Sequence, residues 1–402
     1  MPKLSLSDFG RYTLIFAIAT QILLFTKNLI LNPMIKFAAE PGRFDATCNV
    51  GFWLAGGLQL AIFGVLSLLA PVGERIFRLE PLDLVIAGAI PLVFWIRDWG
   101  FCAQQAAYRT AKLFIIEAVY WVGTMAGFIW FRFQGNGQIG QVFVIVFACA
   151  ILSSLASILL WPLSGRFSFR IDRDSLRQLL NYGVTTVGLG LSSALLAGAD
   201  LIVLGAIYNS EIVGIYGGAK RVYTVVSAMI STVGLLVIPY ASRLAAEGRQ
   251  EEIRSLFEKT VAYLAVGMAG VVGIGWLLAT PFYHYVMPAS YGDSVPLFRL
   301  LLLAAPFEGL FYLTTAILYG IGAASVTLVT STMALGLLVV VLPTLAYFFG
   351  STGAAVAQVS VTAFVGILMT WRAGQNVQGE WLSTVKRIPT ALQSIMSRTG
   401  RH

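Results

Sequence analysis

Eight charged side chains lie within or at the ends of long apolar segments of the sequence. The bases are Lys27, Arg97, Lys220 and Arg221, and the acids are Asp98, Glu117, Asp200 and Glu308. Ionisable groups in hydrocarbon are costly unless they are paired or hydrated, so each is a candidate functional residue. The set is neutral overall, and a guanidinium group can hold a phosphate through two parallel hydrogen bonds. These residues therefore permit an anionic substrate.

Three of the charges belong to residues 179–249, which contain two segments of membrane-spanning length joined by a turn at 208–211. Asp200 comes late in the first segment, and Lys220 and Arg221 come early in the second. Two antiparallel helices joined by so short a turn would place the three residues at a similar depth. We interpret Lys220 and Arg221 as substrate-binding residues and Asp200 as an ion-coupling residue. The alternative is a structural ion pair that locks the helix hairpin.

A second group of charges lies toward one membrane surface. Arg97 and Asp98 are near the end of one apolar segment, and Glu117 is near the start of the next. Their matched depth predicts an Arg97–Glu117 pair, with Asp98 and Glu117 as structural partners, while Arg97 is also a candidate for substrate binding. Lys27 lies four residues from the end of the first segment. It is either a substrate-binding base or a lysine that extends to the membrane interface.

Glu308 lies near the middle of the segment 296–319, two residues after Pro306. Proline loosens a transmembrane helix, and loosened helices are where transporters bind coupling ions. We therefore interpret Glu308 as a candidate proton or sodium site.

Glycines recur at Gly267, Gly270 and Gly273 in another apolar segment. Small residues at such spacing allow transmembrane helices to approach closely. We expect this stripe to mark close helix packing.

The composition requires a polytopic membrane protein, because 57% of the residues are hydrophobic and only 11% are charged. The sequence predicts an all-α fold of about eleven transmembrane helices, each of roughly 20 residues or more. We expect the spans at 10–31, 50–71, 82–101, 113–132, 141–163, 180–207, 213–238, 260–287, 296–319, 324–348 and 352–371. The net charge of +8 is scattered over short loops, which argues against nucleic-acid binding. Two histidines and three cysteines in unsuitable spacing indicate no metal site, and we expect no cofactor.

The basic residues predict the orientation in the membrane. Of the 27 lysines and arginines, 18 fall on the side reached after the odd-numbered spans and six on the other. By the positive-inside rule the richer side is cytoplasmic. The C-terminus would then be cytoplasmic and the first residues outside, which suggests that the first helix of a twelve-helix parent is missing from this sequence.

An internal repeat supports two related halves. Gly10-Arg11-Tyr12 corresponds to Gly214-Ile215-Tyr216 at an offset of 204, and AAEPGR at 38–43 corresponds to AAEGR at 245–249. Both copies would cross the membrane in the same direction, as in transporters built from two parallel repeats. We expect an N-terminal lobe of about five helices at 1–163, a cytoplasmic linker at 164–179, a C-terminal lobe of about six helices at 180–373 and a cytoplasmic tail at 374–402.

Three segments resemble bacterial polysaccharide flippases of the Wzx type, in the multidrug/oligosaccharidyl-lipid/polysaccharide exporter superfamily. They are LSLSDFGRYTL at 4–14, WIRDWGFCAQQAAYRTAKLFIIEA at 95–118 and GADLIVLGAIYNSEIVGIYGGAKRVY at 198–223. The resemblance implies two six-helix lobes around a central cavity that opens to either side in turn. It also implies an undecaprenyl-pyrophosphate-linked oligosaccharide as cargo, moved across the bacterial inner membrane. The sequence departs from the family by lacking the first helix.

The sequence supports three functional hypotheses. The first is a flippase for a lipid-linked oligosaccharide in polysaccharide or O-antigen biosynthesis, in which bases hold the pyrophosphate and the lipid tail stays among membrane lipids. The second is a multidrug exporter of the same superfamily coupled to Na⁺ or H⁺ through Asp200 and Glu308. The third is a membrane polysaccharide polymerase or glycosyltransferase. Since the outer loops are short and carry no paired catalytic residues, we expect no enzymatic activity.

Overall fold

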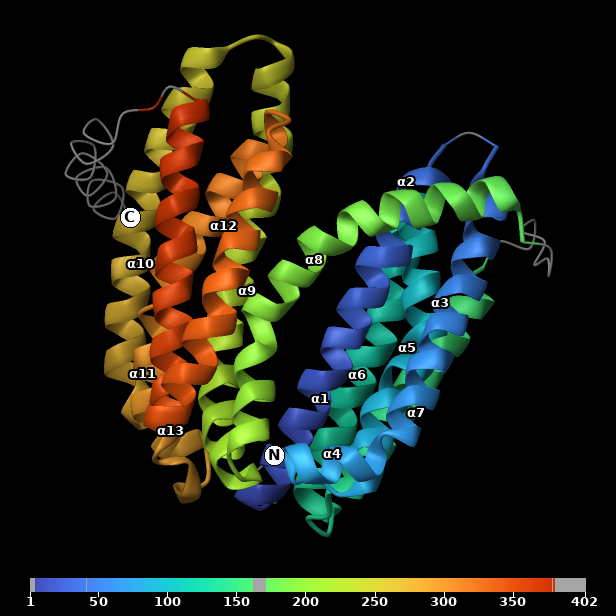
Figure 1. The fold of residues 1–402 in the computed structure, drawn as a ribbon, viewed down its shortest axis with the longest axis vertical. Helices are drawn as coiled ribbons and strands as arrows, with labels where there is room; N and C mark the ends of the chain where they lie inside the picture. Colours follow the sequence, from blue (N-terminus) through green and yellow to red (C-terminus); the bar gives the residue numbers. More distant parts are fainter. Residues whose placement is uncertain (1–3, 41, 162–170, 378, 380–402) are drawn as a thin grey trace. The chain divides into compact units, whose positions relative to one another are not determined.

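All regular secondary structure in the described part of the chain is helical. The computed structural model describes residues 4–40, 42–161, 171–377 and 379. Part of the predicted linker, at 164–170, and most of the predicted tail, at 380–402, therefore lie outside the described residues. The elements are α1 (Leu6–Thr26), η1 (Lys27–Leu31), α2 (Asn32–Ala38), α3 (Phe44–Leu68), α4 (Ala70–Phe77), α5 (Pro81–Ala106), α6 (Thr110–Gln134), α7 (Ile139–Leu159), α8 (Arg173–Ile207), α9 (Ser210–Ala246), α10 (Gln250–Val286), η2 (Ala289–Tyr291), α11 (Ser294–Leu302), α12 (Ala305–Gly320) and α13 (Ala324–Asn376) (Figure 1).

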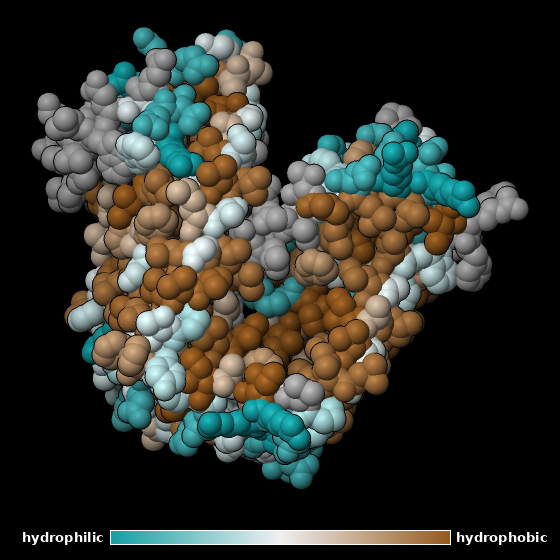
Figure 2. Space-filling model, viewed as in Figure 1, coloured by the Kyte–Doolittle hydropathy of each residue, from teal (hydrophilic) through white to brown (hydrophobic). Residues whose placement is uncertain are grey.

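The helices match the predicted transmembrane architecture. Eight helical segments among the described residues are long and apolar enough to cross a bilayer. The sequence predicted eleven spans. Two of the three additional predicted spans lie in α8 and α9, and the third arises because α13 covers two predicted spans, one on each side of Gly350. That glycine has φ 62°, a left-handed conformation that interrupts the helix. In each part of the molecule a broad hydrophobic band lies between hydrophilic ends (Figure 2). The predicted all-α membrane fold is confirmed.

Local sequence explains where several helices begin and break. Ser5 caps α1 by accepting a hydrogen bond from the Asp8 backbone N–H at 3.0 Å. Glu80 and Asp83 form a capping box at the start of α5, whose first residue is Pro81. The predicted ninth span is two helices, α11 and α12, because the chain turns before Pro306, which cannot donate a backbone hydrogen bond.

The chain divides into two compact units, residues 1–214 and 215–402. In the first unit, α8 packs against α1, η1, α2 and α3, and its first half crosses the end of the bundle near α2 (Figure 1). We had assigned α8 to the C-terminal lobe, with a boundary at residue 180. Packing alone does not decide which repeat α8 belongs to, so that lobe assignment stays a prediction.

The first unit has a core rich in aromatic residues near α2. Trp99 is fully buried, stacks on Trp161 with ring centroids 4.5 Å apart, and donates a hydrogen bond to the carbonyl of Cys48 at 2.9 Å. Met34 is also fully buried in this cluster. The second unit has its own cluster, in which Phe257 of α10 and Met369 of α13 are buried. Each unit therefore buries apolar side chains independently.

The starts of α1 and α9 meet through a reciprocal pair of glycines. A Cβ on Gly10 would overlap the carbonyl oxygen of Ser210, and a Cβ on Gly214 would overlap the carbonyl oxygen of Leu6. Both pairs of equivalent residues, 6 with 210 and 10 with 214, differ by 204, which is the offset of the repeat found in the sequence. Each helix start thus places a glycine against a backbone carbonyl of the other.

The glycine stripe of α10 does not pack closely, contrary to our expectation. A Cβ added at Gly267, Gly270 or Gly273 would meet no other atom within 4 Å. Glycine spacing alone does not distinguish a helix contact from an open surface, and here the stripe is open.

The glycine contact predicts a sharp difference between two similar substitutions. Gly10→Leu should lower the thermal unfolding midpoint of the purified protein in detergent by several degrees, because the side chain would overlap backbone that cannot move independently. Gly57→Leu is the matched control, since a Cβ at exposed Gly57 of α3 meets nothing within 4 Å. Equal midpoints for the two variants would contradict the close contact.

Candidate functional site

The first unit contains an ionic network inside the predicted hydrocarbon depth, centred on Arg97 of α5. Arg97 Nη1 lies 2.6 Å from Asp98 Oδ1, and Nη2 lies 2.5 Å from Glu117 Oε1 of α6. Trp121, one turn along α6, donates its indole N–H to Glu117 Oε2 at 2.7 Å. The guanidinium also lies over the ring of Tyr120, 4.7 Å from its centroid. The pair that matched depths suggested is thus present in the structure.

The Arg97 side chain is held on several sides. It is only 10% exposed, whereas the Asp98 and Glu117 side chains are 24% and 33% exposed. Its Nε is buried without a hydrogen-bond partner, and both terminal nitrogens are bonded to carboxylates. Two of its five N–H groups bind carboxylates and the side chain is largely buried, so this geometry favours a structural pair. Its role in substrate binding stays a prediction.

Lys27 is the accessible base of this region. It is exposed and is the first residue of η1, a π-helical segment within the first span. Next to it, the Asn28 side chain donates to the carbonyl of Leu24 at 2.8 Å and accepts from Asn32 at 3.0 Å. Lys27 is close enough to act electrostatically on Asp98. Single π turns inside α-helices often occur at functional sites, so this placement supports a binding role for Lys27.

The second unit contains a carboxylate held by hydroxyl groups. Glu308 lies in the first turn of α12, just after the break between α11 and α12. Tyr223 of α9 donates a short hydrogen bond to Glu308 Oε2, and Ser227 Oγ donates to Oε1 at 2.5 Å. Partly buried carboxylate oxygens and hydroxyls are hard ligands suited to Na⁺ or to an exchangeable proton. The sequence located Glu308, but not the two partners from α9.

The third predicted group is divided between the two units. Asp200, on α8 in the first unit, is 1% exposed, and its Oδ1 accepts a hydrogen bond from the backbone N–H of Leu201 at 2.9 Å. Lys220 and Arg221, on α9 in the second unit, differ in environment, since Lys220 is buried and Arg221 is exposed. The association of Asp200 with these two bases, and their roles, stay predictions.

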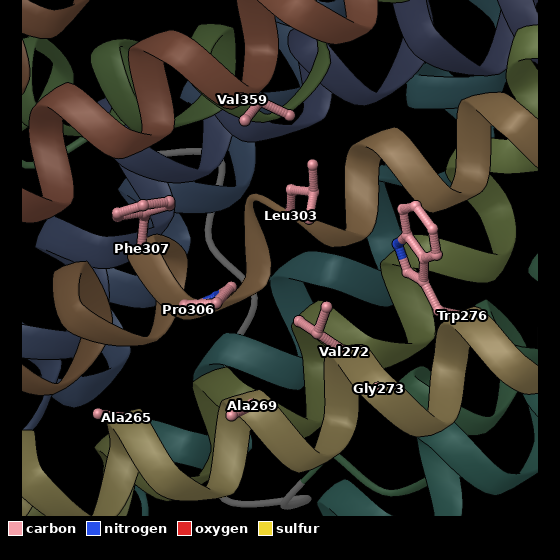
Figure 3. A pocket seen from close by; sticks show the side chains of 9 residues that line it. All are labelled: Ala265, Ala269, Val272, Gly273, Trp276, Leu303, Pro306, Phe307 and Val359. Atoms are coloured by element: carbon pink, nitrogen blue, oxygen red, sulfur yellow. The ribbon is translucent and has the colours of Figure 1, made fainter. Parts of the chain in front are cut away.

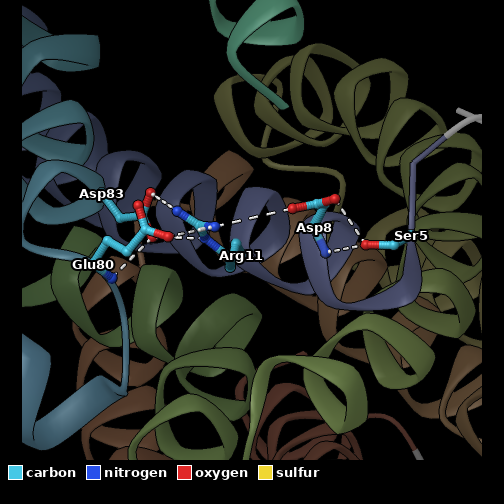
Figure 4. A network of polar contacts seen from close by, with 5 residues as sticks. All are labelled: Ser5, Asp8, Arg11, Glu80 and Asp83. Atoms are coloured by element: carbon cyan, nitrogen blue, oxygen red, sulfur yellow. Dashed lines mark hydrogen bonds and ion pairs between the residues drawn. The ribbon is translucent and has the colours of Figure 1, made fainter. Parts of the chain in front are cut away.

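A network that we did not anticipate joins α1 to α5 (Figure 4). Arg11 Nε and Nη2 bind Asp83 Oδ2 and Oδ1 at 2.9 and 3.0 Å, and Nη1 lies 3.0 Å from Glu80. Asp83 is 2% exposed, so the bidentate pair is largely removed from solvent. The sequence analysis assigned Arg11 to the internal repeat but gave it no ionic partner. The Glu80-x-x-Asp83 capping pattern was the signal that could have located its partner.

The second unit has an uncharged counterpart of this network. Ser294, at the start of α11, donates its hydroxyl to the carbonyl of Ile215 at 2.7 Å. Ile215 corresponds to Arg11 by the offset of 204, whereas Ser294 and Asp83 are 211 residues apart. Arg97 follows Asp83, and Glu308 follows Ser294, by the same 14 residues. The main polar residue of each unit therefore follows a helix-joining contact at the same sequence distance.

Comparison with known proteins agrees with the fold. A family model described as polysaccharide biosynthesis protein matches residues 4–296. An inward-facing multidrug resistance MATE transporter of the MOP superfamily aligns with a TM-score of 0.77 at 13% identity, over 93% of this chain and 91% of its own. The lipid II flippase MurJ, in an inward closed conformation, aligns with a TM-score of 0.69 at 13% identity, over 98% of this chain and 91% of its own.

A MOP superfamily transporter from Pyrococcus furiosus, described as having a binding pocket of reverse polarity, aligns at a TM-score of 0.61 and 14% identity, over 94% of this chain and 89% of its own. At these identities the likeness shows the fold alone. Curated proteins give no sequence match.

The Arg97 network predicts strongly coupled substitutions. Arg97→Gln should reduce the free energy of unfolding by about 3 kcal/mol, the lower end of the range for breaking a buried pair, since Glu117 stays partly exposed. Adding Glu117→Gln should restore part of that loss, because the unpaired carboxylate is removed. Thermal unfolding of the four members of this cycle measures the coupling. Arg243→Gln, which breaks an exposed pair with Glu247, is the control and should have little effect.

Proposed function

Because the chain belongs to the family of polysaccharide biosynthesis proteins and has the fold of MOP superfamily transporters, we propose that it is a flippase for a lipid-linked oligosaccharide. In this proposal, an undecaprenyl-pyrophosphate-linked oligosaccharide crosses the bacterial inner membrane by alternating access, for polysaccharide or O-antigen biosynthesis. The C-terminus is cytoplasmic, as the distribution of Lys and Arg favours.

The observation that carries the proposal is an accessible base beside a hydrogen-bonded charge network at membrane depth. Lys27 is exposed on the π-helical segment, while Asp98 and Glu117 are already engaged by Arg97. A pyrophosphate approaching Lys27 meets an exposed cation, and Lys27 and Arg97 together balance the charge of the two neighbouring carboxylates. Lys220 and Arg221 would supply further bases. In low dielectric such charge attraction is stronger than in water, which suits a transient anionic cargo.

We do not propose an enzyme. The carboxylates of the described networks bind Arg97, Tyr223, Ser227 and Arg11 within or beside membrane-spanning helices. Their arrangement offers charge neutralisation and ion binding, and it favours transport.

The proposed role of the bases predicts a loss of export. Lys27→Ala, and separately Lys220→Ala combined with Arg221→Ala, should each reduce surface polysaccharide at least fivefold in cells that lack the unaltered protein, because the pyrophosphate loses a cationic partner. Surface polysaccharide and membrane protein level are measured together. Arg132→Ala removes an exposed base at the end of α6 and should leave export unchanged. Normal export in the Lys27 and Lys220/Arg221 variants would refute the assigned role.

A second candidate function, cation-coupled export of drugs, is favoured by the Glu308 site. Its carboxylate, held by Tyr223 and Ser227, could bind Na⁺ or H⁺. The same site could couple either a lipid-linked sugar or a drug to an ion gradient.

Coupling through Glu308 predicts loss of ion-driven transport on neutralisation. In membrane vesicles, Glu308→Gln should abolish cation-driven dye efflux, and Tyr223→Phe should weaken it, because the first removes the charge and the second removes one donor. Glu252→Gln alters an exposed carboxylate at the start of α10 and serves as the control. Absence of efflux in vesicles containing the unaltered protein would remove the drug-export hypothesis and leave the flippase proposal intact.

A further inference from the structure

An apolar groove of about 760 Å³ opens on the second unit, between α10, the break that separates α11 from α12, and α13 (Figure 3). Its lining consists of hydrophobic or small side chains, namely Ala265, Ala269, Val272, Gly273, Trp276, Leu303, Pro306, Phe307 and Val359. The volume is within the range of ligand-binding pockets. Such a surface in a membrane protein suits a hydrocarbon chain.

The sequence creates this groove in two ways. On α10, Ala265, Ala269 and Gly273 recur at intervals of four residues, so one face of the helix has almost no side chain. Opposite them, the chain leaves helical geometry before Pro306, which separates α11 from α12. Nothing lies within 4 Å of a Cβ added at Gly273. The depression is therefore a result of residue size and helix interruption.

A cation stands at one end of the groove. Arg299 lies one turn before Leu303, and its Nη2 donates to the Trp276 carbonyl at 3.2 Å and to Thr280 Oγ1 at 3.0 Å. Its guanidinium is 5.4 Å from the centroid of the Trp276 ring. Among the described residues no carboxylate forms an ion pair with Arg299, and its Nε is buried without a hydrogen-bond partner. Arg299 thus retains an uncompensated positive charge beside an apolar surface.

We propose that this groove binds an anionic phospholipid of the surrounding bilayer. One acyl chain lies along Ala265, Ala269 and Gly273, and the phosphate sits at Arg299. The apolar lining complements the chain, the unpaired guanidinium complements the phosphate, and Trp276 occupies the boundary between them, where aromatic side chains are favoured in membranes. Basic pockets between transmembrane helices are suited to lipid head groups.

The position of the groove separates it from the proposed coupling site. Pro306 and Phe307 line the groove, whereas Glu308 is bonded to Tyr223 and Ser227 of α9. In the proposed orientation α11 begins at the outer membrane surface, and Arg299 is five residues from its first residue, Ser294. The bound lipid therefore belongs to the outer leaflet and is independent of the transported cargo.

The test measures lipid binding to the full-length protein, purified and stripped of lipid, by native mass spectrometry. Phosphatidylglycerol and phosphatidylcholine with identical acyl chains are added separately. The unaltered protein should retain phosphatidylglycerol at least fivefold better than phosphatidylcholine. Gly273→Leu should reduce retention of phosphatidylglycerol at least fivefold, because the new side chain fills the groove. Arg299→Gln should bring the preference between the two lipids to within twofold.

Gly267→Leu is the matched control, because Gly267 is on the opposite face of α10 and its surroundings are equally open. It should bind both lipids as the unaltered protein does. Ala269→Phe provides a second groove-filling variant should Gly273→Leu fail to fold. The proposal is overturned when a folded groove variant binds like Gly267→Leu, or when Arg299→Gln keeps the preference for phosphatidylglycerol. The proposal is also overturned, in favour of a substrate lipid, when equimolar long-chain polyprenyl phosphate displaces phosphatidylglycerol but phosphatidylglycerol does not displace polyprenyl phosphate.

Discussion

The need to compensate charge in a low-dielectric environment determines how the polar residues of this protein are arranged. An isolated ion at membrane depth is unfavourable by several kcal/mol, and the chain meets this constraint within each unit. In the first, Arg97 binds two carboxylates, and Arg11 binds Asp83 through both of its oxygens. In the second, Glu308 accepts hydrogen bonds from two hydroxyl groups. Helices that would otherwise be held only by dispersion forces are thereby fixed in register.

The two units compensate their buried polar groups with different chemistry. Where the first unit has the Arg11–Asp83 ion pair, the second has a hydroxyl–carbonyl hydrogen bond between Ser294 and Ile215. Where the first has a buried guanidinium, the second has a carboxylate. A repeat that began with two similar halves can separate tasks in this way. In the proposed function, Lys27 of the first unit contributes to binding an anion, and Glu308 of the second unit binds a cation.

The sequence predicted those features of the structure that depend on one local property, such as the length of an apolar segment or the depth of a charge in the membrane. Hydrophobic length located the spans, and matched depth on consecutive helices suggested the Arg97–Glu117 contact. Sequence reasoning failed where long-range packing decides. Tyr223 and Ser227 are more than 80 residues before Glu308, so no local pattern connects them to it. The open stripe at Gly267 and Gly273 is a second example, because the same glycine spacing occurs whether or not another helix packs against it. The Arg11 partner was missed although its capping pattern was visible.

The π-helical segment at Lys27–Leu31 affects how this chain should be aligned with related proteins. A π turn holds more residues than an α turn, so it behaves as a one-residue insertion within a continuous helix. Residues after it, including Pro33 and Met34, are rotated by about 100° from where an uninterrupted α-helix would put them. An alignment without a gap here would assign the wrong face to everything between Asn32 and Ala38. Homologues with a single-residue deletion at this position are therefore expected to keep the same buried face.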